Sequence, residues 1–215
     1  MTKIMDAAER LFALHGIEGV PLRQILIEAK QRNKYAITLY FGGKEELVVA
    51  IIGRRIEAMN VHRKRLIAEA KIRGDLDSVR TLLEVIYRPL AEVSDSTGQY
   101  TYARFLQQVT LYHSFSSRWP SIPFEGEHYD AYRRLRKQAA GLSDDEYDGL
   151  LAVIAGMFLT AITTRGLRIM EGRRTAPFGE FFRNLLNMAT VAFASALEGG
   201  RAKSANRAAG RRSTR

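Results

Sequence analysis

The chain has 215 residues, of which 46% are hydrophobic, so it is long enough to fill a core and is not disordered throughout. It contains no cysteine, which excludes disulfides and thiolate metal sites. The net charge of +10 lies mainly at the two ends: 1–55 holds nine basic and six acidic residues, and the segment after 198 holds six basic residues and no acid. A polyanion is therefore the expected partner of at least one end.

The sequence predicts neither a membrane span nor a leader. The longest apolar run, 150–163, is shorter than the roughly 20 residues that a spanning helix needs. The first residues form an amphipathic pattern that carries Glu9 and Arg10, unlike the apolar centre of a signal peptide. We therefore expect a cytoplasmic protein with no membrane partner.

Apolar residues recur at intervals of three and four along the chain, which indicates an all-α fold. Gly16 is expected to stop the first helix, and Ser143 with Glu146 forms a capping box that starts a later one. The predicted helices cover 4–15, 21–29, 33–41, 44–73, 76–94, 99–117, 127–140, 143–171 and 177–198.

These helices divide the chain into three parts. Residues 1–47 are predicted to form a three-helix N-terminal helix-turn-helix domain, and 48–198 a larger helical domain for ligand binding and dimerisation. Residues 199–215 have no apolar face to bury and are expected to be a disordered basic tail.

Three short helices, with a polar turn between the second and third, are typical of proteins that place one helix in the major groove of DNA. At about 100 degrees per residue, Ala36, Ile37 and Tyr40 share one side of the third helix and are expected to face the other two helices. Tyr35, Thr38 and Leu39 then point outward, with Lys34 on the flank.

Four motifs lie in the first quarter of the chain: Ile4-Met5-Asp6-Ala7-Ala8-Glu9-Arg10-Leu11-Phe12, His15-Gly16, Leu22-Arg23-Gln24-Ile25 and Tyr40-Phe41-Gly42-Gly43-Lys44-Glu45-Glu46-Leu47. In these motifs the chain resembles the TetR family of regulators. The turn Ala29-Lys30-Gln31-Arg32-Asn33 resembles a variant branch whose turn reads Ala-Gly-Gln-Arg-Asn. The family implies a homodimer that binds double-stranded operator DNA.

Two residues depart from the family pattern. Lys30 stands where the turn usually has glycine, and Leu39 stands where a tyrosine that touches a phosphate is common. The resemblance implies phosphate contacts from Arg23 and Lys44, and an apolar Leu39 could meet a thymine methyl. Together with the outward residues of the third helix, the predicted DNA-binding set is Arg23, Arg32, Asn33, Lys34, Tyr35, Thr38, Leu39, Tyr40 and Lys44.

The two last helices each carry a broad apolar face, wider than one neighbouring helix covers, which favours a second surface. By resemblance, this pair forms a four-helix interface with the same helices of a second copy. Small residues four apart would permit close approach. The predicted dimer interface is Ala152, Gly156, Thr160, Leu186, Ala189 and Phe193.

Aromatic residues are concentrated in the middle helices, where they could form a core or line a pocket. The predicted ligand-binding set is Phe105, Val109, Tyr112, His113 and Phe158. We predict a repressor that a small apolar or aromatic effector releases from its operator.

Two other classes remain open at this point. The segment from Glu125 to Asp130 places carboxylates and an imidazole close together, as in a helical enzyme or metal-binding protein. It lacks the helical spacing of two histidines that a metal site would use, and an acidic loop leading into a helix explains it more simply. A helical adaptor is the other alternative, although it would need no basic turn. We predict no enzyme activity, no metal site and no cofactor.

Overall fold

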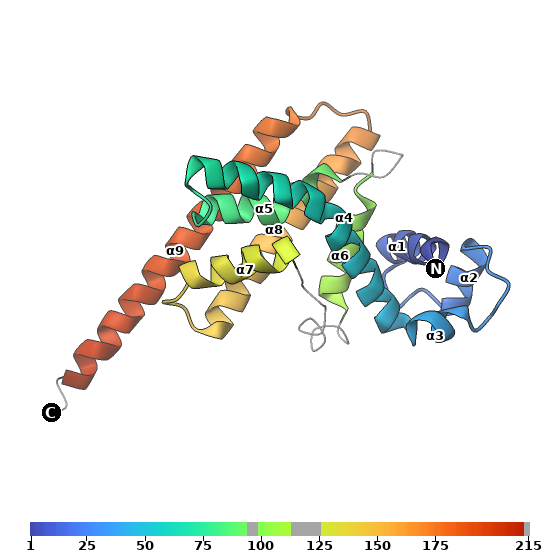
Figure 1. Ribbon diagram of the computed structural model, residues 1–215, viewed down its shortest axis with the longest axis horizontal. Coiled ribbons are helices and arrows are strands. Elements are labelled where there is room, and N and C mark those ends of the chain that lie inside the picture. The colour runs from blue at the N-terminus through green and yellow to red at the C-terminus, as the bar shows by residue number, and fades with distance from the viewer. Residues whose placement is uncertain (94–98, 113–125, 213–215) are drawn as a thin grey trace.

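The computed structural model describes residues 1–93, 99–112 and 126–212, with side chains up to Gly200, and the regular structure in these ranges is α-helical (Figure 1). The predicted all-α class is therefore confirmed. The helices are α1 (Thr2–His15), α2 (Leu22–Glu28), α3 (Ala36–Phe41), α4 (Lys44–Arg73), α5 (Val79–Glu92), α6 (Thr101–Leu111), α7 (Gly126–Gln138), α8 (Asp144–Met170) and α9 (Phe178–Arg212).

Helices α1, α2 and α3 form a small unit at one end of the molecule (Figure 1). Phe12, Ile25 and Ile37, one from each helix, are at most 1% exposed. Leu47 and Val48 from the first turn of α4 join the same core and are fully buried. The apolar spacing of each short helix thus turns one stripe inward and leaves the opposite stripe to solvent.

The long helix α4 joins this unit to the rest of the chain. It begins after Gly43 and ends at Gly74, whose φ of 75° is the left-handed conformation that favours glycine at a helix end. Its bounds are those predicted from the sequence. Because α4 contacts α1 and α3 near its start and α5 and α7 further along, one continuous helix connects the two parts.

Helices α5 to α9 form the larger body. The predicted capping box at the start of α8 is present: Ser143 Oγ accepts a hydrogen bond from the Glu146 backbone N–H, and the Glu146 carboxylate accepts one from the Ser143 N–H. In the centre of this body, Tyr87 of α5 stacks on Phe158 of α8 with ring centroids 4.1 Å apart.

Helix α9 continues to Arg212 and extends beyond the rest of the molecule, away from α1–α3 (Figure 1). This differs from the predicted helix end at 198 and disordered tail. Residues 201–212 consist mainly of Ala, Arg and Lys, which are strong helix formers. A helix already formed on the core can be prolonged without a new nucleation step, so a segment that has no apolar face can still be helical.

Three of the residues predicted for the dimer interface lie on the inner face of α9. Leu186, Ala189 and Phe193 are 2%, 0% and 0% exposed within a single chain. They lie on the buried side of α9, which packs against α5 and α8, so they belong to the core of one copy. A charged residue at Phe193 would therefore disrupt folding before it could test association.

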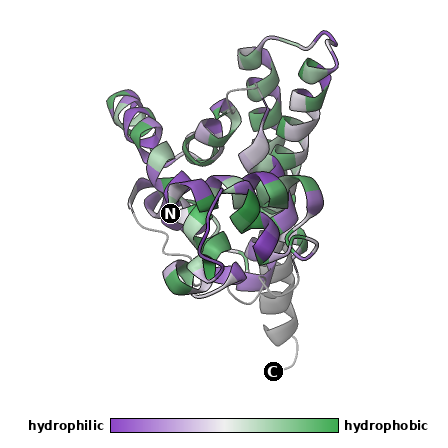
Figure 2. Ribbon diagram, turned by 90° about the vertical axis from the view of Figure 1, so that its right-hand side faces the viewer, coloured by the Kyte–Doolittle hydropathy of each residue, from purple (hydrophilic) through white to green (hydrophobic). Residues whose placement is uncertain are grey.

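Helix α8 has the opposite property, because its outer stripe of small residues is uncovered. Ala152, Gly156 and Thr160 are exposed, and Val153 beside them is 68% exposed. By length and composition alone, α8 could cross a membrane, and only 33% of its most apolar window is buried in this chain. Figure 2 shows hydrophobic residues along α8 and α9, the two helices joined by the loop at the top of the view. Three of the six predicted interface residues are therefore available to a partner.

Candidate nucleic-acid interface

The turn after α2 is a Schellman motif centred on Lys30. The Gln31 N–H donates to the Leu26 carbonyl at 2.8 Å, and the Lys30 N–H donates to the Ile27 carbonyl at 3.0 Å. Lys30 has a φ of 52°, and it is the only non-glycine residue with positive φ in the part of the chain that the structure describes. This left-handed position explains why a glycine is usual at this point of the turn.

Replacing Lys30 with glycine is expected to raise the free energy of unfolding by about 0.5 to 1 kcal/mol. The left-handed conformation costs a side-chain-bearing residue roughly 1 to 2 kcal/mol, and the larger freedom of glycine in the unfolded chain offsets only part of this. Urea denaturation with an unchanged m-value measures the gain. Arg32→Gly is the matched control, since Arg32 has no positive φ and should lose stability. A Lys30→Gly variant that is no more stable than the wild type would show that the backbone of Lys30 is not strained.

Polar side chains of the same turn set the start of α3. The Gln31 side-chain oxygen accepts from the Asn33 N–H at 3.2 Å, and Asn33 Oδ1 accepts from the Tyr35 N–H at 2.9 Å. The second bond is an Asx turn, which holds the chain in place just before Ala36. Asn33 was predicted to bind DNA, and here its side-chain oxygen is used by the backbone. Because of this turn, α3 begins at Ala36 and not at the predicted residue 33.

Helix α3 presents the predicted residues to solvent. Ala36 and Ile37 are at most 1% exposed, whereas Tyr35 and Leu39 are 63% and 68% exposed. Thr38 and Lys34 are exposed as well, and the Lys34 ammonium lies 4.9 Å from the centre of the Tyr35 ring.

Tyr40 differs from its predicted placement. It was expected to face α1 and α2 with Ala36 and Ile37, but its side chain is 48% exposed. The helix has only six residues and its C-terminal end lies at the edge of the core, so the inward stripe ends before Tyr40. Its ring and hydroxyl are therefore available on the outer face, as a phosphate contact would require.

Basic side chains surround this exposed part of α3. Arg23 and Lys30 on α2 and its turn, and Arg32 before α3, lie at the surface, and none has an ion-pair partner among the described residues. The only acid between Arg23 and Lys44, Glu28, is paired with Arg10 of α1 at 3.1 Å. The surface that could meet a phosphate backbone therefore has little negative charge of its own.

Ile27 is a residue of this surface that the sequence analysis missed. It is 66% exposed, although isoleucine in a core helix is normally buried. Ile27 lies four residues after Arg23, on the same outer side of α2. The helical spacing from Arg23 was the signal that could have found it.

Lys44 was predicted to contact a phosphate, and in the structure its side chain forms hydrogen bonds within the protein. Its Nζ donates to the carbonyl oxygens of Ile17 at 2.9 Å and Glu18 at 3.4 Å, in the loop between α1 and α2. Burial lowers the pKa of Lys44, and the nearby Glu18 acts in the opposite direction. Lys44 therefore fixes the α1–α2 loop to the first turn of α4, and at most part of its donor capacity remains for DNA.

Residues 4–51 match the family model of bacterial regulatory proteins of the tetR family. The match covers α1, α2, α3 and the first turns of α4, which are the elements that carry the exposed basic surface. The chain therefore carries the DNA-binding unit of the tetR family at its N-terminus. It is a DNA-binding transcription regulator with an N-terminal helix-turn-helix. Among curated proteins, none matches the chain.

A buried ion network attaches the TetR-family DNA-binding unit to α4. Glu9 of α1 is 2% exposed at its side chain and accepts hydrogen bonds from Arg55 Nε at 2.8 Å and from Arg55 Nη2. Arg54 contacts the same carboxylate at 3.4 Å and Asp6 at 2.7 Å. Arg55 also lies over the ring of Tyr102 in α6, so one acidic residue connects three helices.

The second attachment of the DNA-binding unit is between α1 and α6. Phe12 of α1 stacks on Phe105 of α6 with ring centroids 6.2 Å apart, and both rings are fully buried. Gly16 approaches Gln108 of α6 so closely that a Cβ atom there would lie 3.3 Å from its side-chain oxygen. A displacement of α6 would therefore move α1 as well, because the two helices are in direct contact.

The residues predicted to bind a ligand lie in the packed interior and not at a described cavity. Phe105 packs on Phe12, and Phe158 packs on Tyr87. Val109 is 2% exposed, and Tyr112 is partly buried at the end of α6. His113 lies outside the described residues. Neither of the two cavities described for this chain is lined by any member of the set.

The acidic segment from Glu125 to Asp130 was considered as an enzyme or metal site. Its described side chains do not converge on one point. Glu127 pairs with Lys64, Asp130 pairs with Arg133, and His128 is buried. Glu125 lies outside the described residues. Among the residues that are described, no group of three or more metal-ligating side chains is present.

Proposed function

We propose that this regulator is a homodimeric repressor that reads a near-palindromic operator with α3 and is released from it by a small molecule. The observation that carries the proposal is the outward face of α3, formed by Tyr35, Thr38 and Leu39 and held at both ends by defined turns. A rigid, exposed and acid-free helix face of this kind suits the major groove. Such a regulator acts where the chromosome lies, in the cytoplasm.

Two classes of contact follow from the positions of the side chains. Arg23 and Arg32 flank α3 and would neutralise phosphates, while Lys34, Tyr35 and Thr38 lie where base edges would be. Lys44 is assigned to neither class and is proposed to hold the α1–α2 loop in place, because its ammonium already donates to two backbone carbonyls. In a dimer the two α3 helices would enter successive major grooves about one helical turn, or a multiple of it, apart.

Leu39→Tyr is expected to raise affinity for DNA upstream of the protein's own gene by about three- to tenfold. Leu39 is 68% exposed, so a tyrosine can extend its hydroxyl to a phosphate and gain one hydrogen bond. Because a phosphate contact carries no sequence information, the ranking of single-base operator variants should stay the same. Fluorescence anisotropy with a set of operator variants measures both quantities.

Arg23→Gln serves as the reference variant in the same experiment. It should weaken binding to every sequence and reduce the slope of log affinity against log salt by about one. If Leu39→Tyr changes the ranking of operator variants, Leu39 reads a base and α3 is rotated in the groove relative to this proposal. If the wild type binds DNA without salt dependence, the proposal that this surface binds DNA is wrong.

The homodimer is proposed from the uncovered stripe on α8. A Cβ atom added to Gly149 or Gly156 would meet nothing within 4 Å in the single chain, so a second helix could approach closely there. On α9, Met188 and Val191 are 54% and 68% exposed and lie opposite the buried stripe. A second copy that covers these apolar residues accounts for them without a membrane.

The effector response is proposed to pass through α6. An effector that favours a displaced α6 would move α1 through the Phe12–Phe105 contact and change the spacing of the two α3 helices. An effector can shift this equilibrium only by its differential affinity for the two states. An apolar or aromatic part of the effector would suit the apolar side chains of the middle helices, which include Phe105, Val109, Tyr112 and Phe158.

A further inference from the structure

The end of α9 lies beyond the packed body of the molecule. Gly200 is buried, and a Cβ atom there would lie 2.7 Å from the Leu142 side chain and 3.1 Å from the Gly141 carbonyl oxygen. From this contact the helix continues to Arg212. In Figure 1 the longest axis of the molecule is horizontal, and the C-terminus lies at one end of it while α1–α3 lie at the other. We call residues 201–212 the C-terminal arm.

The C-terminal arm is basic and contains no acid. Its charged residues are Arg201, Lys203, Arg207, Arg211 and Arg212, and its other residues are Ala, Ser, Asn and Gly. Lys203, Arg207 and Arg211 are four residues apart in a continuous helix, so these positions follow one side of it. The arm therefore has a basic side, and it has no apolar residue larger than alanine.

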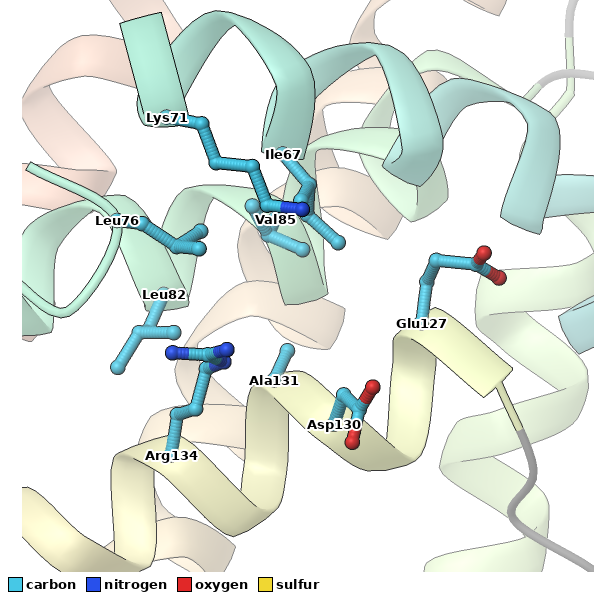
Figure 3. Close-up of a pocket in the computed structure, with 9 residues that line it drawn as sticks. All are labelled: Ile67, Lys71, Leu76, Leu82, Val85, Glu127, Asp130, Ala131 and Arg134. Carbon is cyan, nitrogen blue, oxygen red and sulfur yellow. The ribbon is translucent and has the colours of Figure 1, made fainter. Parts of the chain in front are cut away.

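The body from which the arm extends is electrically balanced. Residues 56–198 hold eighteen basic and seventeen acidic residues. The rim of the cavity between α4, α5 and α7 is an example, because Lys71 and Arg134 lie there beside Glu127 and Asp130 (Figure 3). Both of these acids form ion pairs with neighbouring basic residues. The excess positive charge after residue 55 is therefore concentrated at the C-terminal end.

Stabilisation of the helix itself accounts for only part of the charge on the arm. Basic residues in the last turn interact favourably with the negative end of the helix dipole, but this effect fades within that turn. It explains Arg211 and Arg212, whereas Arg201, Lys203 and Arg207 precede the last turn. Charges distributed along the whole arm suit a partner with an extended negative charge.

We propose that the C-terminal arm binds the phosphate backbone of a DNA duplex other than the one that α3 reads, so that one regulator holds two segments of DNA together. Residues four apart are about 6 Å apart along a helix, and duplex DNA carries one charge per about 1.7 Å, so the basic side can neutralise several phosphates. Because the arm and α3 lie at opposite ends of the longest axis, a second duplex can meet the arm without touching the first (Figure 1).

A lipid surface suits the arm less well than DNA. A helix that lies in a membrane interface buries bulky apolar side chains, and the arm has none. Binding to DNA requires only phosphate neutralisation, which carries no sequence information. The inference goes beyond the proposed function and uses only DNA binding by the N-terminal unit.

The test variant is the full chain with a neutral arm, in which Lys203→Gln, Arg207→Gln and Arg211→Gln are combined. Glutamine is a good helix former, so the helix should persist, and circular dichroism checks this. DNA from upstream of the protein's own gene is fixed to a sensor surface, saturated with protein and washed. A second, labelled duplex of unrelated sequence is then passed over the surface at several salt concentrations.

The wild type should capture the second duplex with an affinity that falls as salt rises. At about 0.1 M salt the neutral-arm variant should capture it about 10- to 100-fold more weakly, and the slope of log affinity against log salt should fall by about three for each arm engaged. Its affinity for the first duplex should equal that of the wild type, because the arm does not contact that duplex.

The matched control combines Ala202→Gln, Ser204→Gln and Ala208→Gln, which adds as many glutamines to the arm and keeps every charge. It should capture the second duplex like the wild type. Equal capture by the wild type and the neutral-arm variant, or no capture by either, overturns the inference. Weaker binding of the neutral-arm variant to the first duplex also overturns it, because the arm would then lie on the DNA that α3 reads.

Two further measurements separate other partners of the arm. Wild-type protein that binds phosphatidylserine vesicles but no second duplex would identify the arm as a membrane-binding element and overturn the inference. A lower mass of the neutral-arm variant by light scattering, with unchanged capture per bound chain, would show that the arm holds a second copy instead. If the wild type does not bind the upstream DNA, the proposed function fails, and the arm is tested with the protein itself fixed to the surface by its N-terminus.

Discussion

Glu9→Ala is expected to lower the free energy of unfolding by about 3 kcal/mol. Its carboxylate is buried and is the shared acceptor for Arg54 and Arg55, so removal leaves the partly buried Arg55 without its counter-charge and Arg54 with Asp6 alone. Removing one partner of a buried ion pair typically costs about 3 to 5 kcal/mol, and the partial exposure of both arginines favours the lower value. For a chain of this length the melting temperature should fall by roughly 6 to 12 °C.

Glu28→Ala is the control, since it removes the same residue type from a Glu–Arg pair of the same domain. Glu28 and Arg10 have about half of their side chains exposed, so this pair should contribute at most about 1 kcal/mol. Differential scanning calorimetry of both variants at one protein concentration makes the comparison. Equal losses for the two variants would show that the Glu9 network does not hold α1 on α4.

Val153→Asp is expected to convert the dimer to a monomer and to weaken operator binding by about 10² to 10⁴-fold. Val153 is 68% exposed in a single chain, so a carboxylate there is tolerated by the fold. In the proposed dimer it would be buried against the second copy without a partner, which opposes association. Operator affinity falls because the second half-site then has to be bound by an independent molecule.

Light scattering measures the mass, which should fall from twice the 24.3 kDa of the chain to the single value. Val61→Asp is the matched control, because Val61 is 72% exposed but lies on α4, away from the stripe of α8. It should remain a dimer and bind the operator like the wild type. A dimer of unchanged stability with Val153→Asp would show that α8 does not form the interface.

The sequence by itself determined most of the helical elements and the exposed face that we propose reads DNA. The all-α class, the bounds of α4 and the capping box at Ser143 follow from spacing and from local hydrogen bonding, which act over four residues or fewer. The outward direction of Tyr35, Thr38 and Leu39 was predictable for the same reason, because the pitch of a helix sets which side chains share a face.

Only the tertiary structure decided which partner each face meets. Phe193 and Gly156 were both predicted as interface residues, but Phe193 is fully buried within its own chain, whereas the Gly156 stripe of α8 is open. Lys44 was predicted to contact a phosphate, but in the structure its ammonium donates to two carbonyl oxygens of the α1–α2 loop. Arg63 of α4 is 1% exposed because α6 and α7 pack over α4, and no sequence pattern indicated this burial. Each of these outcomes depends on contacts between residues far apart in the chain, and helical periodicity carries no information about them.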